Sequence, residues 1–186
     1  MKLFFDTEFT GLKKNTTLVS IGIVADNGKK FYAEFTDYDA KQVDKWIKEN
    51  VIDNLLLDGM GDGVSETDEN PSCVLVRGNK EYVKDELVEW ISQFDSVQFI
   101  SDVCHYDFVL LIDIFGTAFD LPDNVSASCH DINQDIAKHY GISEREAFDK
   151  SREYIVSELC SEPISGVKHN SLYDAEVIKA IYEEVI

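Results

Sequence analysis

The sequence predicts an α/β domain built on a mixed sheet. Three β-rich runs open the chain, at residues 3–5, 17–25 and 30–35, and the hairpin turn Asp26-Asn27-Gly28 joins the second to the third. A long helical pattern, a short apolar strand and another helix follow, and this order favours a crossover between parallel strands. Antiparallel strands that precede a parallel pair are typical of a mixed α/β sheet.

Length, composition and charge limit the class of protein. The 186 residues fit a single domain over 1–186, and a hydrophobic content of 44% is enough for a core. No apolar run reaches the length of a membrane span, and Asp6 comes too early for a signal peptide, so we expect a cytoplasmic protein. The net charge of −19 opposes indiscriminate binding to nucleic acid. It still allows a phosphate substrate, because bound metal ions reverse the local charge.

The middle and end of the chain alternate predicted helices with short strands. A helix is expected from Asp39 to Val51, with Trp46 on its apolar stripe, and Asn79 is expected to cap a helix that continues to Phe94. Further predicted elements are strands at 73–76 and 97–100, a helix at 106–115, short helices at 131–139, about 143–149 and about 151–160, and a last helix from about 170 to 184.

One segment lacks these patterns. Between about residues 58 and 72, Gly59, Gly61 and Gly63 stand among acidic side chains. Glycine and clustered charge favour solvent exposure and backbone freedom. We therefore predict a mobile acidic surface loop here.

Two carboxylates end the first strand. Asp6 and Glu8 are separated by one residue, and side chains alternate along a strand, so both should project from the same face. Two like charges in one place repel each other, and Mg²⁺ or Mn²⁺ would relieve the repulsion because these ions favour carboxylate oxygens. Taken alone, the pair could equally lie in a solvated turn.

Two later helices each carry an acid on the apolar face. Asp107 lies at helical spacing from Leu110, Leu111 and Ile114, and Asp174 lies at helical spacing from Ile178, Ile181 and Val185. Burying an ion is costly unless something compensates its charge. Four inward acids without matching inward bases indicate bound cations. His169 precedes the last helix and has the side chain of a general base near neutral pH.

Three sequence blocks resemble those of the DEDDh branch of the DnaQ-like 3′–5′ exonucleases. The block D-T-E-F-T-G-L that starts at Asp6 is similar to that family's D-x-E-x-T-G-L, and H-N-S-L-Y-D-A that starts at His169 is similar to H-x-A-x-x-D-A. The middle block holds Tyr106-Asp107 but has Val103 where the family commonly has Asn, which concerns a substrate contact rather than a metal ligand.

One subgroup is especially similar. The segments F-x-D-T-E-F, S-x-G-x-V-A-x-x-G and Y-D-x-V-L resemble the small stand-alone exoribonucleases first described from mycobacteria, which have relatives in phages. The resemblance runs from residue 3 to the last helix. It implies a ribonuclease-H-like fold with a mixed five-stranded sheet, three of its strands antiparallel, between helices.

The resemblance also implies a mechanism. Asp6, Glu8, Asp107 and Asp174 would hold two Mg²⁺ or Mn²⁺ ions, and His169 would be the general base in 3′–5′ cleavage that releases nucleoside 5′-monophosphates. RNA is the expected substrate and a homodimer the implied assembly. The terminal nucleotide would be bound by the segment comprising Thr7, Phe9, Thr10, Gly11 and Leu12.

Two alternatives stay open at this point. A DNA exonuclease or proofreading nuclease would use the same residues, because contacts to the ribose 2′-hydroxyl cannot be read from a sequence. A module that binds nucleic acid without cutting it is the other, since a fold does not guarantee activity. Such a module would be expected to have lost one of the four acids or His169, and none is lost here.

Overall fold

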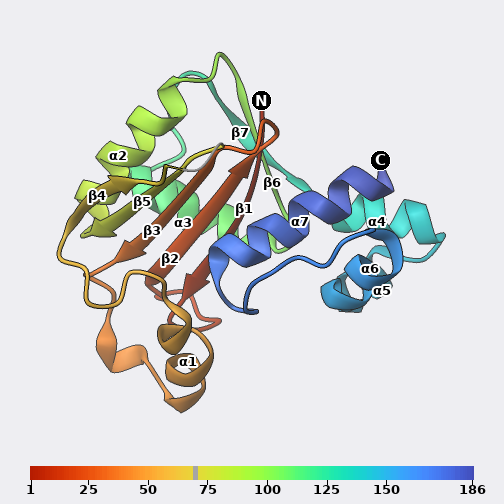
Figure 1. Ribbon diagram of the computed structural model, residues 1–186, viewed down its shortest axis with the longest axis horizontal. Coiled ribbons are helices and arrows are strands. Elements are labelled where there is room, and N and C mark those ends of the chain that lie inside the picture. Colours follow the sequence, from red (N-terminus) through yellow and green to blue (C-terminus); the bar gives the residue numbers. More distant parts are fainter. Residues whose placement is uncertain (69–70) are drawn as a thin grey trace.

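The protein forms one mixed sheet flanked by helices (Figure 1). The structure is a computed structural model that describes residues 1–68 and 71–186. Seven strands lie in the order β4-β5-β3-β2-β1-β6-β7, which corrects the prediction of five. The strands are β1 (Lys2–Phe9), β2 (Leu18–Ala25), β3 (Lys30–Phe35), β4 (Gly63–Glu66), β5 (Cys73–Gly78), β6 (Val97–Ser101) and β7 (Val125–Asp131).

The pairing of the strands confirms a mixed sheet. β1, β2 and β3 are antiparallel neighbours, as predicted, and β1 also pairs in parallel with β6. β5 runs parallel to β3, β7 runs parallel to β6, and β4 is antiparallel to β5. β1 therefore lies near the middle of the sheet, with its carboxyl end beside that of β6.

The two strands missing from the prediction form the two edges of the sheet. β4 is short and largely exposed, and it lies inside the segment predicted as an acidic loop. β7, with the sequence V-S-A-S-C-H-D, buries few of its side chains. Neither strand has the apolar alternation that identifies a strand in a sequence. Residues 69 and 70 of the predicted loop lie outside the described residues, and its mobility stays a prediction.

The helices largely follow the predicted positions. They are η1 (Ala40–Gln42), α1 (Lys45–Asn50), η2 (Ile52–Asn54), α2 (Lys80–Ser92), α3 (Cys104–Phe115), α4 (Asn133–Tyr140), α5 (Glu144–Asp149), α6 (Arg152–Leu159) and α7 (Ser171–Val185). The helix predicted from Asp39 to Val51 is instead η1 and α1, because Asp44 leaves the helical conformation and accepts a hydrogen bond from Ile47 N as the N-cap of α1. No helix in the described ranges is long and apolar enough to cross a membrane.

The two faces of the sheet are covered by different helices. Leu3 and Phe5 of β1 belong to the apolar core beneath α2 and α3, whereas Phe4 points to the other face, into the core formed with α4–α7. Figure 1 shows α7 crossing the sheet, with α4, α5 and α6 gathered beside it. Because side chains alternate, Asp6 and Glu8 share the face of Phe4, and Thr7 turns toward α3.

A glycine lets α7 approach the sheet closely. Gly22 of β2 lies opposite Asp6 in the antiparallel register. A Cβ atom added to Gly22 would lie 2.3 Å from the backbone of Ser171 and Leu172, at the start of α7. Beside it, the buried hydroxyls of Ser20 and Ser171 lie 2.9 Å apart. The amino end of α7 is thus seated directly on β2, which fixes the position of Asp174 relative to β1.

Replacing this glycine should disturb the site as well as the fold. Gly22→Ala places a methyl group against backbone that cannot move aside cheaply, so we expect a loss of about 1–3 kcal/mol in the free energy of unfolding, typical of overpacking. Urea denaturation measures this loss. Gly61→Ala is the matched control because a Cβ there meets nothing within 4 Å. Equal stability of the two variants would contradict this account of α7 packing.

Candidate active site

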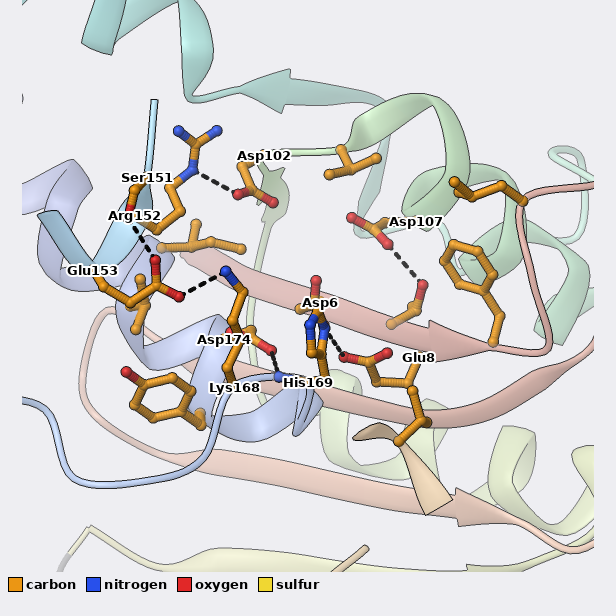
Figure 2. Close-up of a pocket in the computed structure, with 18 of the residues that line it drawn as sticks. Asp6, Glu8, Asp102, Asp107, Ser151, Arg152, Glu153, Lys168, His169 and Asp174 are labelled. Atoms are coloured by element: carbon orange, nitrogen blue, oxygen red, sulfur yellow. Dashed lines mark hydrogen bonds and ion pairs between the residues drawn. The ribbon is translucent and has the colours of Figure 1, made fainter. Parts of the chain in front are cut away.

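A cavity of about 650 Å³ opens at the carboxyl end of β1. Its walls come from β1 and the turn after it, from α1, from the β6–α3 connection, from the α5–α6 segment, and from the start of α7 (Figure 2). All five side chains predicted as catalytic or metal-binding line this cavity: Asp6, Glu8, Asp107, His169 and Asp174. Its volume suits a small ligand such as a nucleotide.

Asp6 and Glu8 enter the cavity from the sheet. The Oδ2 atom of Asp6 is buried and has no hydrogen-bond partner among the described residues. Leaving a buried carboxylate oxygen without a donor is costly, so such an atom indicates a ligand that the protein itself does not supply. Oε1 of Glu8 lies 3.8 Å from Nδ1 of His169.

Asp107 is held by two hydroxyl groups at the first turn of α3. Thr7 Oγ1 donates to its Oδ1 at 2.7 Å, and Ser101 Oγ donates to its Oδ2 at 2.5 Å. Asp107 is only 1% exposed. Thr7 and Ser101 come from the adjacent parallel strands β1 and β6, so the sheet itself orients the carboxylate of Asp107.

Asp174 and His169 are held together by the backbone. The N–H of His169 donates to Oδ2 of Asp174 at 2.8 Å. The connection before α7 is clamped further by Asn54, whose side chain donates to the carbonyl of Lys168 and whose carbonyl accepts from the side chain of Asn170. These contacts fix both the first turn of α7 and the residue that precedes it.

His169 has an unusual backbone conformation. Its φ of 62° makes it the one non-glycine residue with a positive φ in the described ranges. Such a conformation costs of order 1–3 kcal/mol and persists where surrounding contacts impose it, often at functional sites. The imidazole contacts the indole of Trp46 edge to face, with ring centroids 5.1 Å apart. The contacts therefore direct the ring of His169 into the mouth of the cavity.

Burial and mutual repulsion raise the pKa values of the acids. Desolvation, followed by the charges of neighbouring carboxylates, raises the pKa of Glu8 to about 9 and that of Asp6 well above its usual range. Desolvation raises the pKa values of Asp107 and Asp174 to about 7. Desolvation and the nearby Lys168 lower the pKa of His169, which keeps the imidazole neutral and able to accept a proton.

The acids form two groups suited to cations. Ligand atoms of Glu8, His169 and Asp174 lie within 4.8 Å of one another, and so do those of Asp6, Asp102 and Asp107. Carboxylate oxygens are ligands for hard divalent cations such as Mg²⁺ and Mn²⁺. The donor set and the partnerless oxygen of Asp6 fit such ions.

The predicted substrate-binding residues divide into two sets. Thr7, Phe9, Gly11 and Leu12 line the cavity, and the ring of Phe9 stacks on Tyr106 with centroids 5.3 Å apart. Thr10 is not among the lining residues. Its hydroxyl is buried in a network with Gln42 and Thr17, where it holds the turn after β1 in place.

Sequence reasoning missed several side chains of the cavity, and Trp46, Asp102 and Arg152 are the three with the clearest contacts to the site. Trp46 was assigned to an apolar stripe, but it is 54% exposed at the cavity mouth. Asp102 and Arg152 line the cavity and form an ion pair with each other. The position of Asp102 directly after β6 was an available signal, since the carboxyl ends of adjacent parallel strands meet at one edge of a sheet.

Comparison with known proteins finds relatives of the chain among exonucleases. The 3′–5′ exoribonucleases MT2234.1 and Rv2179c, from two strains of Mycobacterium tuberculosis, are each 28% identical to the chain over 136 residues, covering 72% of this chain and 73% of the relative. The nuclease domain of 3′hExo, a DEDDh family member solved bound to rAMP, has a TM-score of 0.64 at 11% identity, covering 97% of this chain and 88% of that one.

A second solved structure shares the fold. It describes 3′-end-specific recognition of a histone mRNA stem-loop by a 3′-exonuclease, and it has a TM-score of 0.65 at 9% identity, covering 99% of this chain and 63% of that one. At such low identity these two likenesses establish the fold alone, which confirms the ribonuclease-H-like architecture. The sequence model of the 3′–5′ exoribonuclease Rv2179c-like domain matches residues 1–186. The chain therefore belongs to the Rv2179c-like 3′–5′ exoribonuclease domain family.

Proposed function

We propose that the chain is a single-domain, metal-dependent 3′–5′ exoribonuclease that releases nucleoside 5′-monophosphates. One observation carries the proposal: carboxylates from β1, α3 and α7 converge in one cavity, where Oδ2 of Asp6 is buried without a donor. RNA is the proposed substrate because the family and the curated relatives are named 3′–5′ exoribonucleases.

Asp6, Glu8, Asp107 and Asp174 would hold two divalent cations, Mg²⁺ or Mn²⁺. When bound, such ions supply the positive charge that stabilises the attacking and leaving oxygens of a phosphodiester. The side chains around the acids keep the donor set in place, since Asp107 is held by hydroxyls of Thr7 and Ser101. Hydrogen-bonded carboxylates with fixed orientations lose little freedom when a cation binds.

His169 is the proposed general base. It would accept the proton of the water that attacks the terminal phosphodiester, whose bond to the 3′ oxygen of the preceding nucleotide breaks. The products are a nucleoside 5′-monophosphate and a strand with a new 3′-hydroxyl. The lowered pKa of His169 favours the neutral imidazole that the role of general base requires. The contact with Trp46 limits the rotation of the ring.

The terminal nucleotide would lie against the turn after β1. Phe9, Gly11 and Leu12 line the cavity there, and Leu12 is 76% exposed at its rim. Apolar contact with a base is tolerant of sequence, and stacking contributes about 1–3 kcal/mol per base. Thr7 would contribute by holding the carboxylate of Asp107, and Thr10 would contribute by holding the turn after β1 in shape. The implied homodimer and the cytoplasmic location stay predictions, and the residues described here offer the homodimer no support.

The first test is product analysis on 5′-labelled RNA and DNA oligomers of identical sequence. With Mg²⁺ or Mn²⁺ we expect a ladder that shortens from the 3′ end, faster on RNA, and no ladder with EDTA or with Asp6→Ala. Asp123→Ala, which removes an exposed acid far along the chain from the cavity residues, is the control and should cut normally. Metal-independent cleavage would contradict the proposed mechanism, faster cleavage of DNA would favour a DNA exonuclease, and no cleavage at all would leave a binding module.

Removing the proposed base should slow the chemical step. We expect His169→Ala to lower kcat by about 10²–10⁴-fold, the usual contribution of general acid–base catalysis, with a much smaller effect on KM. Single-turnover kinetics on labelled RNA measures this step. His139→Ala, at an exposed position on α4, is the matched control. A rate for His169→Ala within about threefold of the control would exclude a general-base role.

Without metal, the acids should make stability depend on pH. Their pKa values are raised in the folded protein from unfolded values near 4, so the stability that they contribute is complete below about pH 4. This contribution is lost as the pH rises through about 7 for Asp107 and Asp174 and about 9 for Glu8. The Tm in EDTA should therefore fall between pH 5 and pH 9.

Bound cations should reverse this loss by favouring the ionised carboxylates. We expect the rise in Tm on adding Mn²⁺ to grow with pH. In a protein of this size, each kcal/mol of stabilisation by bound Mn²⁺ raises Tm by about 2–4 °C. Differential scanning fluorimetry at matched ionic strength measures both trends, with Ca²⁺-free NaCl as the salt control. A Mn²⁺-induced rise in Tm that is equally large at pH 5 and pH 8 would refute the assignment.

A further inference from the structure

A fifth carboxylate, that of Asp102, belongs to the cavity. Asp102 follows β6 directly, where the carboxyl ends of β6 and β1 lie side by side. Ligand atoms of Asp6, Asp102 and Asp107 all lie within 4.8 Å of one another. Asp149 and Glu153 also line the cavity, yet neither belongs to a group of ligand atoms among the described residues. Asp102 is thus placed with the acids of the proposed cation site rather than with the outer wall.

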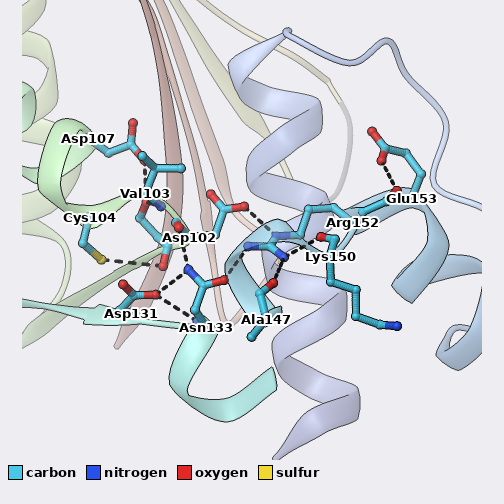
Figure 3. A network of polar contacts seen from close by, with 12 residues as sticks. Asp102, Val103, Cys104, Asp107, Asp131, Asn133, Ala147, Lys150, Arg152 and Glu153 are labelled. Carbon is cyan, nitrogen blue, oxygen red and sulfur yellow. Dashed lines mark hydrogen bonds and ion pairs between the residues drawn. The ribbon is translucent and has the colours of Figure 1, made fainter. Parts of the chain in front are cut away.

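Arg152 anchors Asp102 from the far side (Figure 3). Its Nε donates to Oδ2 of Asp102 at 2.7 Å, and each side chain is only 15% exposed. Three of the four remaining N–H groups of the guanidinium are also engaged: Nη2 donates to Oδ1 of Asn133 at 2.6 Å, and Nη1 donates to the carbonyls of Ala147 and Lys150, both at 3.0 Å. A planar guanidinium held at so many points cannot follow a moving carboxylate, so it fixes the orientation of Asp102.

Asn133 completes the frame around this ion pair. Its Nδ2 donates to the backbone carbonyl of Asp102 at 2.7 Å and to Oδ1 of Asp131 at 2.8 Å. The backbone and the side chain of Asp102 are therefore both restrained, by α4 and by α6. No donor within residues 1–68 and 71–186 bonds to Oδ1 of Asp102, so the frame leaves one oxygen for a ligand.

The charges in this group call for a cation. When all three carboxylates are ionised, the one guanidinium leaves two negative charges, the amount that one divalent cation neutralises. A structural ion pair would gain nothing from a position beside two further carboxylates, because like charges repel strongly at low dielectric. The partnerless Oδ2 of Asp6 lies in the same group and independently indicates a missing ligand.

We propose that Asp102, the fifth acid of the site, is a third carboxylate ligand for the cation held by Asp6 and Asp107, and that Arg152 is a positioning residue that fixes Asp102 in place. The inference rests on the proposed function, because it assigns a further residue to the same cation site. It also gives a role to the α5–α6 segment: the start of α6 supplies the guanidinium that orients Asp102.

Mn²⁺ binding tests this assignment without depending on activity. Titration followed by the EPR signal of free Mn²⁺ should show binding roughly 10–100-fold weaker at one site in Asp102→Asn than in the wild type. Arg152→Lys should weaken the same site, because lysine keeps the charge but loses the guanidinium fork. Asp149→Asn removes an equal charge from the same cavity, and it should bind Mn²⁺ within about twofold of the wild type. Excess Mn²⁺ should restore much of the RNA cleavage of Asp102→Asn.

Folding and function are separated by two further variants. If Asp102→Asn fails to fold, the double variant Asp102→Asn/Arg152→Gln replaces the ion pair with two amides that carry no buried charge. Once folded, this double variant should bind Mn²⁺ more weakly than the wild type. Wild-type affinity in a folded Asp102→Asn or double variant, or an equal loss in Asp149→Asn, would overturn the inference. Asp6→Ala separates an error in the role of Asp102 from an error in the proposed function. If Asp6→Ala also binds Mn²⁺ with wild-type affinity, the proposed cation site itself is wrong.

Discussion

Repulsion among buried carboxylates is the constraint on which the rest of this site depends. Asp6, Glu8, Asp107 and Asp174 share one cavity, where burial and then the charges of neighbouring carboxylates raise the pKa values of Asp6 and Glu8. The fold resists the repulsion with donors that hold individual oxygens: two hydroxyls on Asp107 and the His169 N–H on Asp174. These donors fix positions without neutralising charge. The arrangement is consequently costly to the empty protein and favourable once cations bind.

The central position of β1 makes this convergence possible. Its neighbours are β2, on which α7 is seated at Gly22, and β6, from which the chain enters α3. Both acid-bearing helices therefore begin within reach of the carboxyl end of β1. Much of this could be predicted from the sequence, because strand alternation put Asp6 and Glu8 on one face and helical spacing put Asp107 and Asp174 on buried stripes. Periodicity identifies such residues because the buried side chains of a strand or helix recur at the period of that element.

The elements that escaped prediction lack such a periodic signal. β4 and β7 are edge strands whose exposed side chains are mostly polar, so sheet formation there follows from pairing with a neighbour rather than from burial. Trp46 follows a helical spacing that predicts burial, yet α1 begins only after the N-cap Asp44, and the indole of Trp46 contacts the imidazole of His169 instead. The pair of Asp102 and Arg152 spans 50 residues of sequence, a separation across which a single sequence carries no pattern.

The basic side chains that line the cavity are already engaged by other groups of the protein. Arg152 is engaged by Asp102, and Lys168 pairs with Glu153 at 2.8 Å. The ammonium group of Lys150 lies over the rings of Tyr140 and Tyr154. Because these three cations are already engaged, the attraction for a phosphodiester in the proposed mechanism depends on the bound metal ions rather than on basic side chains. Cation binding and RNA binding would then be coupled, each favouring the other, since linkage between two ligands of one site is reciprocal.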